Sequence, residues 1–260
     1  MAGAPQPLYV QRNQAPGVPP LALTGERTLP DVPAENYWYQ RHLVVYRWIA
    51  ERVRGRSVVD LACGEGYGAN ELAASAATVV GVDANPEAHE HARLRYRRAN
   101  LRFERELIER WQGVADDVVF LQTIEHVEDP DALLARLASL VGSAGALYIS
   151  TPNVLTLAPK GQARSGNPWH VREYRPEEFA ALCGRHFGNV ELRGLFHARK
   201  LLVHELALRA GWDAVHARIG LTDRFYGWFT PAIDVRDFAL RDARGAPMAR
   251  ALDLVAVCRA

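Results

Sequence analysis

The sequence predicts an α/β fold in which helices cover both faces of a sheet of seven mostly parallel strands. Short apolar runs of strand length, such as residues 57–62 and 78–83, alternate along the chain with segments of helical periodicity. Strands that alternate with helices form parallel βαβ units, which is the basis of this prediction. The 260 residues suffice for one large domain or two small ones, and no internal repeat divides them.

Each element is expected from its local pattern. Residues 35–54 carry apolar and aromatic side chains at helical spacing and predict an amphipathic helix. Further helices are expected at 70–77, 86–98, 129–140 and 176–186, and Asp129 and Asp131 are suited to cap the third of these. The expected strands are 57–62, 78–83, 101–104, 117–122, 146–151, 189–195 and 252–258.

Proline content sets the expected domain boundaries. Seven of the 15 prolines lie within the first 33 residues, where regular helix is therefore excluded. Residues 1–22 are expected to form a disordered, proline-rich tail, and residues 23–260 a single domain. Residues 197–250 are too long for a plain crossover between the last two strands, so they are expected to form a helical lid insertion over one edge of the site.

Composition excludes several classes of protein. The formal net charge is only +1, so the chain lacks the basic surface that duplex nucleic acid requires. No apolar run reaches the roughly 18 residues of a membrane span, and the N-terminus lacks the pattern of a secretory signal. Three widely separated cysteines predict neither a disulfide framework nor a structural zinc site. A cytoplasmic enzyme or binding protein is expected, with no nucleic-acid or membrane partner.

A glycine-rich loop follows the first buried strand, in the run Asp60-Leu-Ala-Cys-Gly64-Glu-Gly66-Tyr-Gly68. Glycines let the backbone approach a ligand closely. Asp83 ends the second strand, where a carboxylate can accept both hydroxyls of a ribose. A tight strand-to-helix turn alone would also explain the glycines, but loop and acid together predict a nucleoside cofactor. Asp60 would repel the pyrophosphate of a nicotinamide dinucleotide, the weaker alternative, and suits a cationic amino-acid group.

The loop from Asp60 to Gly68 resembles motif I of the class I S-adenosylmethionine-dependent methyltransferases. The matching segments are 80–83, 120–126, 147–153, 167–170 and 172–179, and the similarity covers about residues 23–195 and the final strand. The resemblance implies a Rossmann-like sheet with an antiparallel last strand. Ala62 stands where this family usually has the first glycine of the motif.

The same resemblance implies S-adenosylmethionine as cofactor, with S-adenosylhomocysteine as product. The residues implied in cofactor binding are Asp60 and Gly64 at the methionine end with Ala62 between them, Asp83 at the ribose with Ala84 after it, Glu106 and Leu107 at the adenine, Gln122 beneath the cofactor, and Tyr37 and His42 from the N-terminal helix. The aromatic residues 37–39 could instead be only the core-facing stripe of that helix.

Two histidines are the candidate catalytic residues. A hydroxyl acceptor must lose a proton, to a histidine or carboxylate or through a metal. His170 is the favoured base and His126 would orient the acceptor, although either could simply hold a loop. A divalent cation could also bind to four neighbouring side chains, Glu125, His126, Glu128 and Asp129. We expect instead that these acids are solvated or cap a helix, so no metal site is assigned.

Segments 24–31 and 35–42 resemble the front end of sugar-modifying methyltransferases, in particular the mycobacterial methylmannose polysaccharide 1-O-methyltransferase group. The expected reaction is O-methylation of a sugar or polysaccharide precursor, so the expected partner is a small-molecule or saccharide acceptor. Two alternatives stay open: a methyltransferase of another small metabolite or natural product, and a pseudoenzyme that binds the cofactor without transferring its methyl group. A homodimer is a further open expectation.

Overall fold

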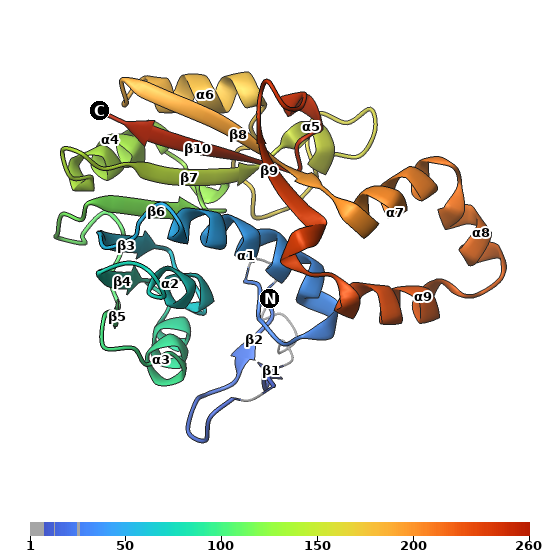
Figure 1. The fold of residues 1–260 in the computed structure, drawn as a ribbon, viewed down its shortest axis with the longest axis horizontal. Coiled ribbons are helices and arrows are strands. Elements are labelled where there is room, and N and C mark those ends of the chain that lie inside the picture. The colour runs from blue at the N-terminus through green and yellow to red at the C-terminus, as the bar shows by residue number, and fades with distance from the viewer. Residues whose placement is uncertain (1–7, 13, 25–26) are drawn as a thin grey trace.

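A computed structural model describes residues 8–12, 14–24 and 27–260. Within these residues, eight strands form one sheet in the order β5-β4-β3-β6-β7-β10-β8-β9 (Figure 1). Their bounds are β3 (Ser57–Leu61), β4 (Thr78–Val82), β5 (Leu101–Glu104), β6 (Asp117–Leu121), β7 (Leu147–Pro152), β8 (Asn189–His197), β9 (Phe238–Asp242) and β10 (Asp253–Arg259). The strands from β5 to β7 are mutually parallel, whereas β10 runs antiparallel to β7 and β8. The predicted fold class, with its antiparallel last strand, is confirmed.

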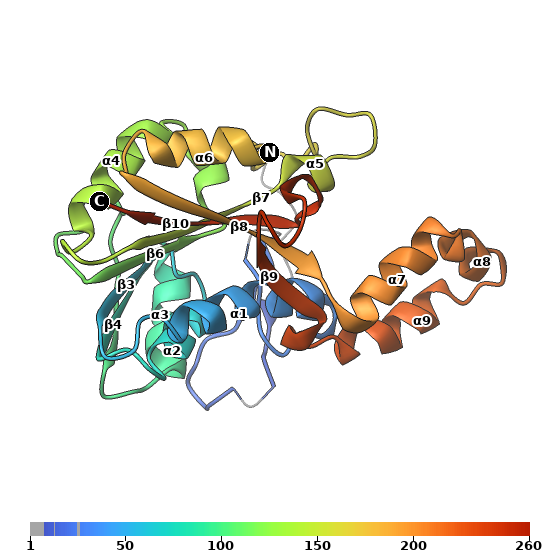
Figure 2. The same ribbon diagram turned by 45° about the horizontal axis from the view of Figure 1, so that its top comes forward.

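Helices cover both faces of this sheet, with α4 and α6 on one side and α1, α2 and α3 on the other (Figure 2). Their bounds are α1 (Asn36–Ala50), α2 (Tyr67–Leu72), α3 (Pro86–Arg95), α4 (Pro130–Leu140), α5 (Val154–Leu157) and α6 (Pro176–Gly184). Neighbouring strand residues point to opposite faces: Val58 packs in the core under α1 and α2, and Val59 in the core under α4 and α6. This double burial explains the continuous apolar runs that predict the strands.

The N-cap of α4 is the predicted one. Asp129 accepts a hydrogen bond from the backbone N–H of Ala132, at 3.0 Å. Asp131 does not cap the helix, because its carboxylate accepts hydrogen bonds from Arg185 and His186 of the neighbouring helix end.

The insertion at residues 197–250 differs from its prediction in its second half. Residues 199–229 form the expected helical arm, made of α7 (Arg199–Arg209), α8 (Trp212–Arg218) and α9 (Thr222–Phe229), which projects from the body of the molecule (Figures 1 and 2). The chain then returns and adds β9 to the sheet edge as an eighth strand, antiparallel to β8. Phe238 and Leu240 pair with His197 and Leu195 of β8. Burial of Phe238 against α1 stabilises this short strand, which its five residues alone do not predict.

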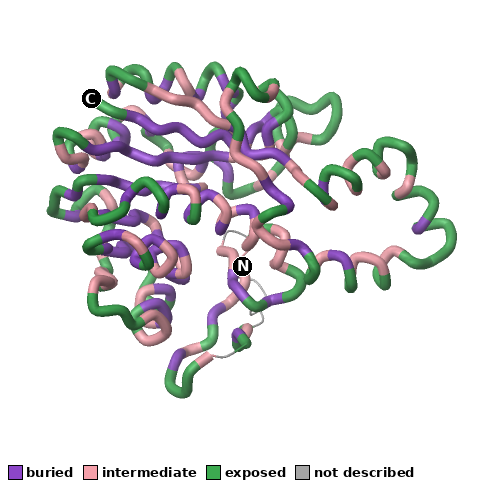
Figure 3. The backbone as a smooth tube through the Cα atoms, viewed as in Figure 1, coloured by how far each residue is buried: buried purple, intermediate pink, exposed green. Residues whose placement is uncertain are grey.

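Aromatic side chains hold the arm together. The ring of Phe225 stacks between His204 and His216, with ring centroids 5.7 Å from each, and also on Phe229 at 5.2 Å. Figure 3 shows that burial is concentrated in the strands of the sheet, whereas most of the arm is exposed or half-buried.

The described part of the N-terminal segment is ordered, unlike the disordered tail that the sequence predicts for residues 1–22. Residues Leu8–Tyr9 (β1) pair with Leu21–Ala22 (β2) in a small antiparallel ribbon. Leu21 packs with Leu29 and Val32 in a separate apolar cluster. The prolines exclude a regular helix but do not exclude this ribbon. The ribbon is stabilised by buried apolar contacts, which the number of prolines does not indicate. Residues 1–7 and 13 lie outside the described residues.

In the described part of the chain, no helix combines the length and the apolar character that crossing a membrane requires.

Candidate active site

The glycine-rich loop connects β3 to α2 and needs left-handed backbone at three positions. Ala62 and Gly64 both have φ of 57°, and Gly66 has φ of 96°. Ala62 therefore adopts the conformation that favours glycine, which accounts for the family preference for glycine there. A Cβ on Gly68 would lie 2.1 Å from the ring of Tyr46, so this glycine lets α1 pack against α2.

A cavity of about 240 Å³ opens above this loop, at the carboxyl ends of β3, β4 and β6. Its walls come from the loop, from α1, from the turn after β6 and from the N-terminal segment. The lining residues are Thr24, Arg27, Thr28, His42, Tyr46, Ala62, Cys63, Gly64, Glu65, Tyr67, Asp83, Leu121, Gln122, Thr123 and His126. The carboxyl ends of strands are where open α/β sheets bind ligands.

Asp83 lies on the cavity wall at the end of β4. One oxygen of its carboxylate accepts from the N–H of Gly64 at 2.8 Å, and the other from the N–H of Asn85 at 2.8 Å. An ionised carboxylate has about four acceptor sites, so two are left for the hydroxyls of a ribose. Asp83 thus joins two loops and keeps acceptor capacity toward the cavity.

Asp60 lies behind the cavity wall and is fully buried. The Tyr46 hydroxyl, which does line the cavity, donates to one of its oxygens at 3.3 Å, and its other oxygen has no hydrogen-bond partner among the described residues. Burial raises the pKa of Asp60 to about 8; the charge of Asp83 adds to the rise and the Tyr46 hydrogen bond opposes it. A buried carboxylate with an unsatisfied oxygen fits the ammonium group of an amino-acid moiety.

His42 and Gln122, which the sequence predicts at the cofactor, also line this cavity. Burial lowers the pKa of His42 to about 4, so this imidazole is neutral at pH 7. Gln122 has φ of 51°, and its side-chain amide donates to the Ser150 hydroxyl at 2.9 Å. This bond turns the glutamine toward β7 at the floor of the cavity.

Four residues expected at the cofactor lie elsewhere in this structure. Tyr37 faces away from His42 on α1. Its hydroxyl donates to His197 at 2.9 Å, and its ring packs against Phe238 at the base of the helical arm. Ala84 is exposed, and its carbonyl accepts from Arg105 at 3.5 Å. Glu106 accepts from the N–H of Leu107, and Leu107 is 45% exposed. None of the four lines the cavity, and neither does any residue of the insertion 197–250, which the sequence predicts as a lid over one edge of the site.

The N-terminal segment closes one side of the cavity, as expected for residues 24–31. Thr24, Arg27 and Thr28 are on the wall, whereas residues 25 and 26 lie outside the described residues. Tyr46 and Tyr67 are lining residues that the sequence did not single out. Only the i, i+4 spacing of Tyr46 from His42 could have indicated the first of them.

A buried polar network ties the N-terminal ribbon to the glycine-rich loop. The carboxylate of Glu65 accepts from Gln11 at 2.9 Å and from the Tyr96 hydroxyl at 2.8 Å. His91 lies 3.2 Å from the same carboxylate, and its other ring nitrogen is 2.6 Å from the carbonyl of Pro19. Loop, ribbon and α3 are therefore joined directly beside the cavity.

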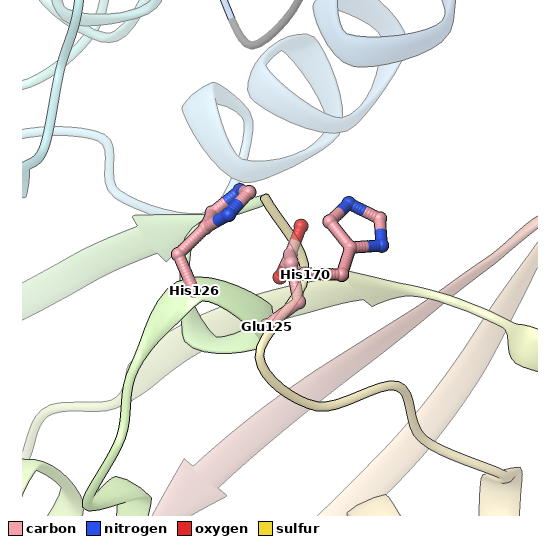
Figure 4. Close-up of side chains that lie close together, drawn as sticks. All are labelled: Glu125, His126 and His170. Atoms are coloured by element: carbon pink, nitrogen blue, oxygen red, sulfur yellow. The ribbon is translucent and has the colours of Figure 1, made fainter. Parts of the chain in front are cut away.

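Glu125, His126 and His170 come together where the cavity meets the loop after α5 (Figure 4). Glu125 and His126 lie on the 3-10 turn after β6, and the N–H of Arg172 donates to the Glu125 carbonyl at 3.0 Å, which joins the two loops. One carboxylate oxygen of Glu125 and one nitrogen of each imidazole lie within 4.8 Å of one another. Glu125 is 2% exposed and His170 is 9% exposed.

Both imidazoles of this cluster are oriented by further hydrogen bonds. Nδ1 of His126 donates to the carbonyl of Trp169 at 2.9 Å. Nδ1 of His170 donates to Glu173 at 2.9 Å, and its Nε2 accepts from the Asn167 amide at 3.0 Å. His126 lines the cavity and His170 does not. His170, which the sequence favours as the base, therefore lies behind His126 as seen from the cavity.

The other acids considered for a cation are not in this cluster. Glu128 and Asp129 are exposed, and Asp129 caps α4.

A doubly wound sheet with a glycine-rich loop, an acid at the end of the next strand and a cavity above both is the arrangement expected of a Rossmann-like methyltransferase of class I. The comparisons agree. The family model described as "Methyltransferase domain" matches residues 37–206, and the chain belongs to this family. Its cofactor is S-adenosylmethionine.

Mycobacterial relatives extend over most of the chain. A "Probable S-adenosylmethionine-dependent methyltransferase" of Mycobacterium tuberculosis is 39% identical over 202 residues, which cover 76% of this chain and 72% of the relative. A similarly named protein of Mycolicibacterium smegmatis is 35% identical over 248 residues, covering 91% of this chain and 94% of the relative. An S-adenosylmethionine-dependent methyltransferase of Mesorhizobium loti has the same fold, with a TM-score of 0.52 at 16% identity over 82% of this chain and 98% of that one.

Proposed function

We propose that the protein transfers the methyl group of S-adenosylmethionine to a hydroxyl of a sugar or polysaccharide precursor. The observation that carries this proposal is the position of His126, on the cavity wall with Glu125 and His170 beside it. An aliphatic hydroxyl needs help in losing its proton, and imidazole is the side chain suited to that task near neutral pH.

The bound cofactor supplies a methyl group on a positively charged sulfur. The acceptor oxygen forms a bond to the methyl carbon while the carbon–sulfur bond breaks, sulfur keeps the electron pair, and the hydroxyl proton is lost at the histidine cluster. The chain's own residues orient the reactants: Asp83 would hold the ribose, Asp60 would balance the ammonium group, and Gln122 would support the cofactor from below. Such positioning supplies a large part of the rate of an in-line displacement.

Within the cluster, His126 would contact the acceptor and His170 would act behind it. This assignment reverses the order favoured from the sequence, since both ring nitrogens of His170 are bonded to Glu173 and Asn167.

Trp169 favours a sugar among hydroxyl acceptors. Trp169 is 58% exposed and its backbone carbonyl accepts from His126, so the loop that orients this imidazole also carries an exposed aromatic residue. Aromatic faces with an apolar body and a polar edge suit the face of a sugar ring. The likeness of segments 24–31 and 35–42 to the methylmannose polysaccharide group supports a mannose-based acceptor.

A panel of acceptors tests the proposal. The protein is incubated with methyl-labelled S-adenosylmethionine and with partly methylated mannosides, unmethylated saccharides, a phenol and an amine. We expect label on a saccharide hydroxyl, located by NMR, and Trp169→Ala should raise KM for the saccharide with unchanged affinity for S-adenosylhomocysteine. Transfer to the phenol or the amine alone would support methylation of another metabolite, and cofactor binding without transfer to any acceptor would support a pseudoenzyme.

A further inference from the structure

We infer that Glu125, His126 and His170 form a binding site for a divalent first-row transition-metal cation. Two imidazoles and one carboxylate are a ligand set that proteins use for such ions, with coordination positions left open for substrate. The three ligand atoms lie within 4.8 Å of one another. Bonds of about 2.0–2.2 Å to one ion bring ligands to about 3.0–3.5 Å from each other, a change that side-chain rotation can supply.

The surroundings of the two histidines are those of metal ligands. A metal-binding imidazole generally donates its other N–H to a carboxylate or a backbone carbonyl, which fixes its orientation. Glu173 has this role for His170 and the carbonyl of Trp169 has it for His126. A cation bound through Nε2 of both rings keeps both hydrogen bonds. The Asn167 amide donates to Nε2 of His170 and so marks the lone pair that the cation would take.

Burial and location agree with a bound cation. Glu125 is 2% exposed, and a buried carboxylate is favoured when it is paired with a positive charge such as a metal ion. The two loops that carry the ligands are also held together by the backbone hydrogen bond from Arg172 to Glu125, so only side-chain rotation is needed to close the ligands on an ion. His126 places one side of the cluster on the cavity wall, so the open coordination positions face the acceptor.

The cation deepens the proposed function, on which its role toward the acceptor rests. An ion at this position would bind the acceptor oxygen and lower the pKa of the hydroxyl, so that the proton passes to water at neutral pH. His126 and His170 would then assist the loss of the proton as ligands of the ion, in place of the histidine base of the proposed function. It also selects acceptors with a second oxygen next to the reacting hydroxyl, as in a sugar diol, because two oxygens can occupy two open positions.

Metal binding is measured on the full chain, without a histidine tag, by titration with Mn²⁺ and by the visible absorption of bound Co²⁺. We expect one ion per chain and a Co²⁺ spectrum of mixed nitrogen and oxygen ligation. Glu125→Gln, His126→Gln and His170→Gln should each weaken Mn²⁺ binding at least about tenfold, and Glu173→Gln, which only positions His170, by about 10–100-fold.

Glu128→Gln is the matched control, since it removes an exposed acid three residues from Glu125, and Mn²⁺ affinity should stay unchanged. Thermal unfolding shows whether each variant is folded. No Mn²⁺ binding to the wild-type protein, or binding that survives the three ligand substitutions in folded variants, would overturn the inference.

Failure of the inference and failure of the proposed function look different. Saccharide methylation at full rate in metal-free protein that binds no Mn²⁺ keeps the function and refutes the metal site. Site-dependent Mn²⁺ binding without methylation of any saccharide keeps the metal site and refutes the function.

Discussion

Replacing Asp83 by alanine should weaken the binding of S-adenosylhomocysteine while the fold survives. In the ligand-free protein each oxygen of this carboxylate accepts one backbone N–H at 2.8 Å, from Gly64 and from Asn85. The remaining lone pairs face the cavity, where two ribose hydroxyls would donate to them. The substitution removes both contacts with the ligand and both contacts within the protein, and the two effects can be measured separately.

The magnitude follows from the kind of bond. Each hydrogen bond to a charged group contributes about 1.5–3 kcal/mol, so loss of the ribose contacts should raise the dissociation constant by at least the roughly 10- to 150-fold that corresponds to one such bond. The N–H groups of Gly64 and Asn85 can turn to water, so the loss of stability should stay near about 0.5–1.5 kcal/mol for each bond.

Isothermal titration calorimetry gives the affinity, and urea unfolding gives the stability. Glu87→Ala is the control, because it removes the same charge from an exposed position four residues further along, in the first turn of α3. Its affinity should equal that of the wild type. A folded Asp83→Ala protein with wild-type affinity would refute the ribose assignment.

Three further predictions concern the same cavity. Burial raises the pKa of Asp60 to about 8, so its carboxyl is neutral below that pH and must release a proton when the ammonium group binds. The affinity for S-adenosylhomocysteine should therefore rise by up to about tenfold per pH unit toward pH 8 and then level off. Calorimetry in buffers of different ionisation enthalpy detects the released proton, and Asp60→Asn should abolish this release. Deleting residues 1–32 should weaken the affinity for S-adenosylhomocysteine, because it removes Thr24, Arg27 and Thr28 from the cavity wall and the hydrogen bond from Gln11 to Glu65. Equal affinity in a folded deletion protein would contradict the role of this segment in closing the cavity. His126→Asn should lower single-turnover methylation by about 10²–10⁴-fold, as judged by quenched-flow sampling, and a wild-type rate would exclude His126 from the reaction.

Much of the sheet could be predicted because its strands are buried on both faces. A strand such as β6 is a continuous apolar run, and the glycines and acids at strand ends mark where ligands bind. The edge strand β9 was missed, since it is short, half-buried and stabilised by contacts with α1 that lie far away in sequence.

The site was predictable where a residue lies next to a strand end, and not where it lies on a helix or a long loop. Ala62, Gly64, Asp83 and Gln122 follow strands and line the cavity. Tyr37 lies on α1 like His42 but faces His197 at the base of the helical arm. Which face of α1 points to the cavity depends on packing that the sequence does not show. The meeting of His170 with His126 depends on the fold of a loop over 40 residues later, so only the three-dimensional structure brings the two together.

Methyl transfer to a partly methylated mannoside in a single turnover shows whether the protein methylates a sugar hydroxyl with the help of His126. Excess protein is mixed with ¹³C-methyl-labelled S-adenosylmethionine and the mannoside, and NMR of the quenched products follows the label. We expect a new O-methyl signal on one hydroxyl for the wild type, and its loss in His126→Asn with S-adenosylmethionine still bound. A label that stays on the cofactor in the wild type, or an O-methyl signal of equal rate in His126→Asn, would contradict this expectation.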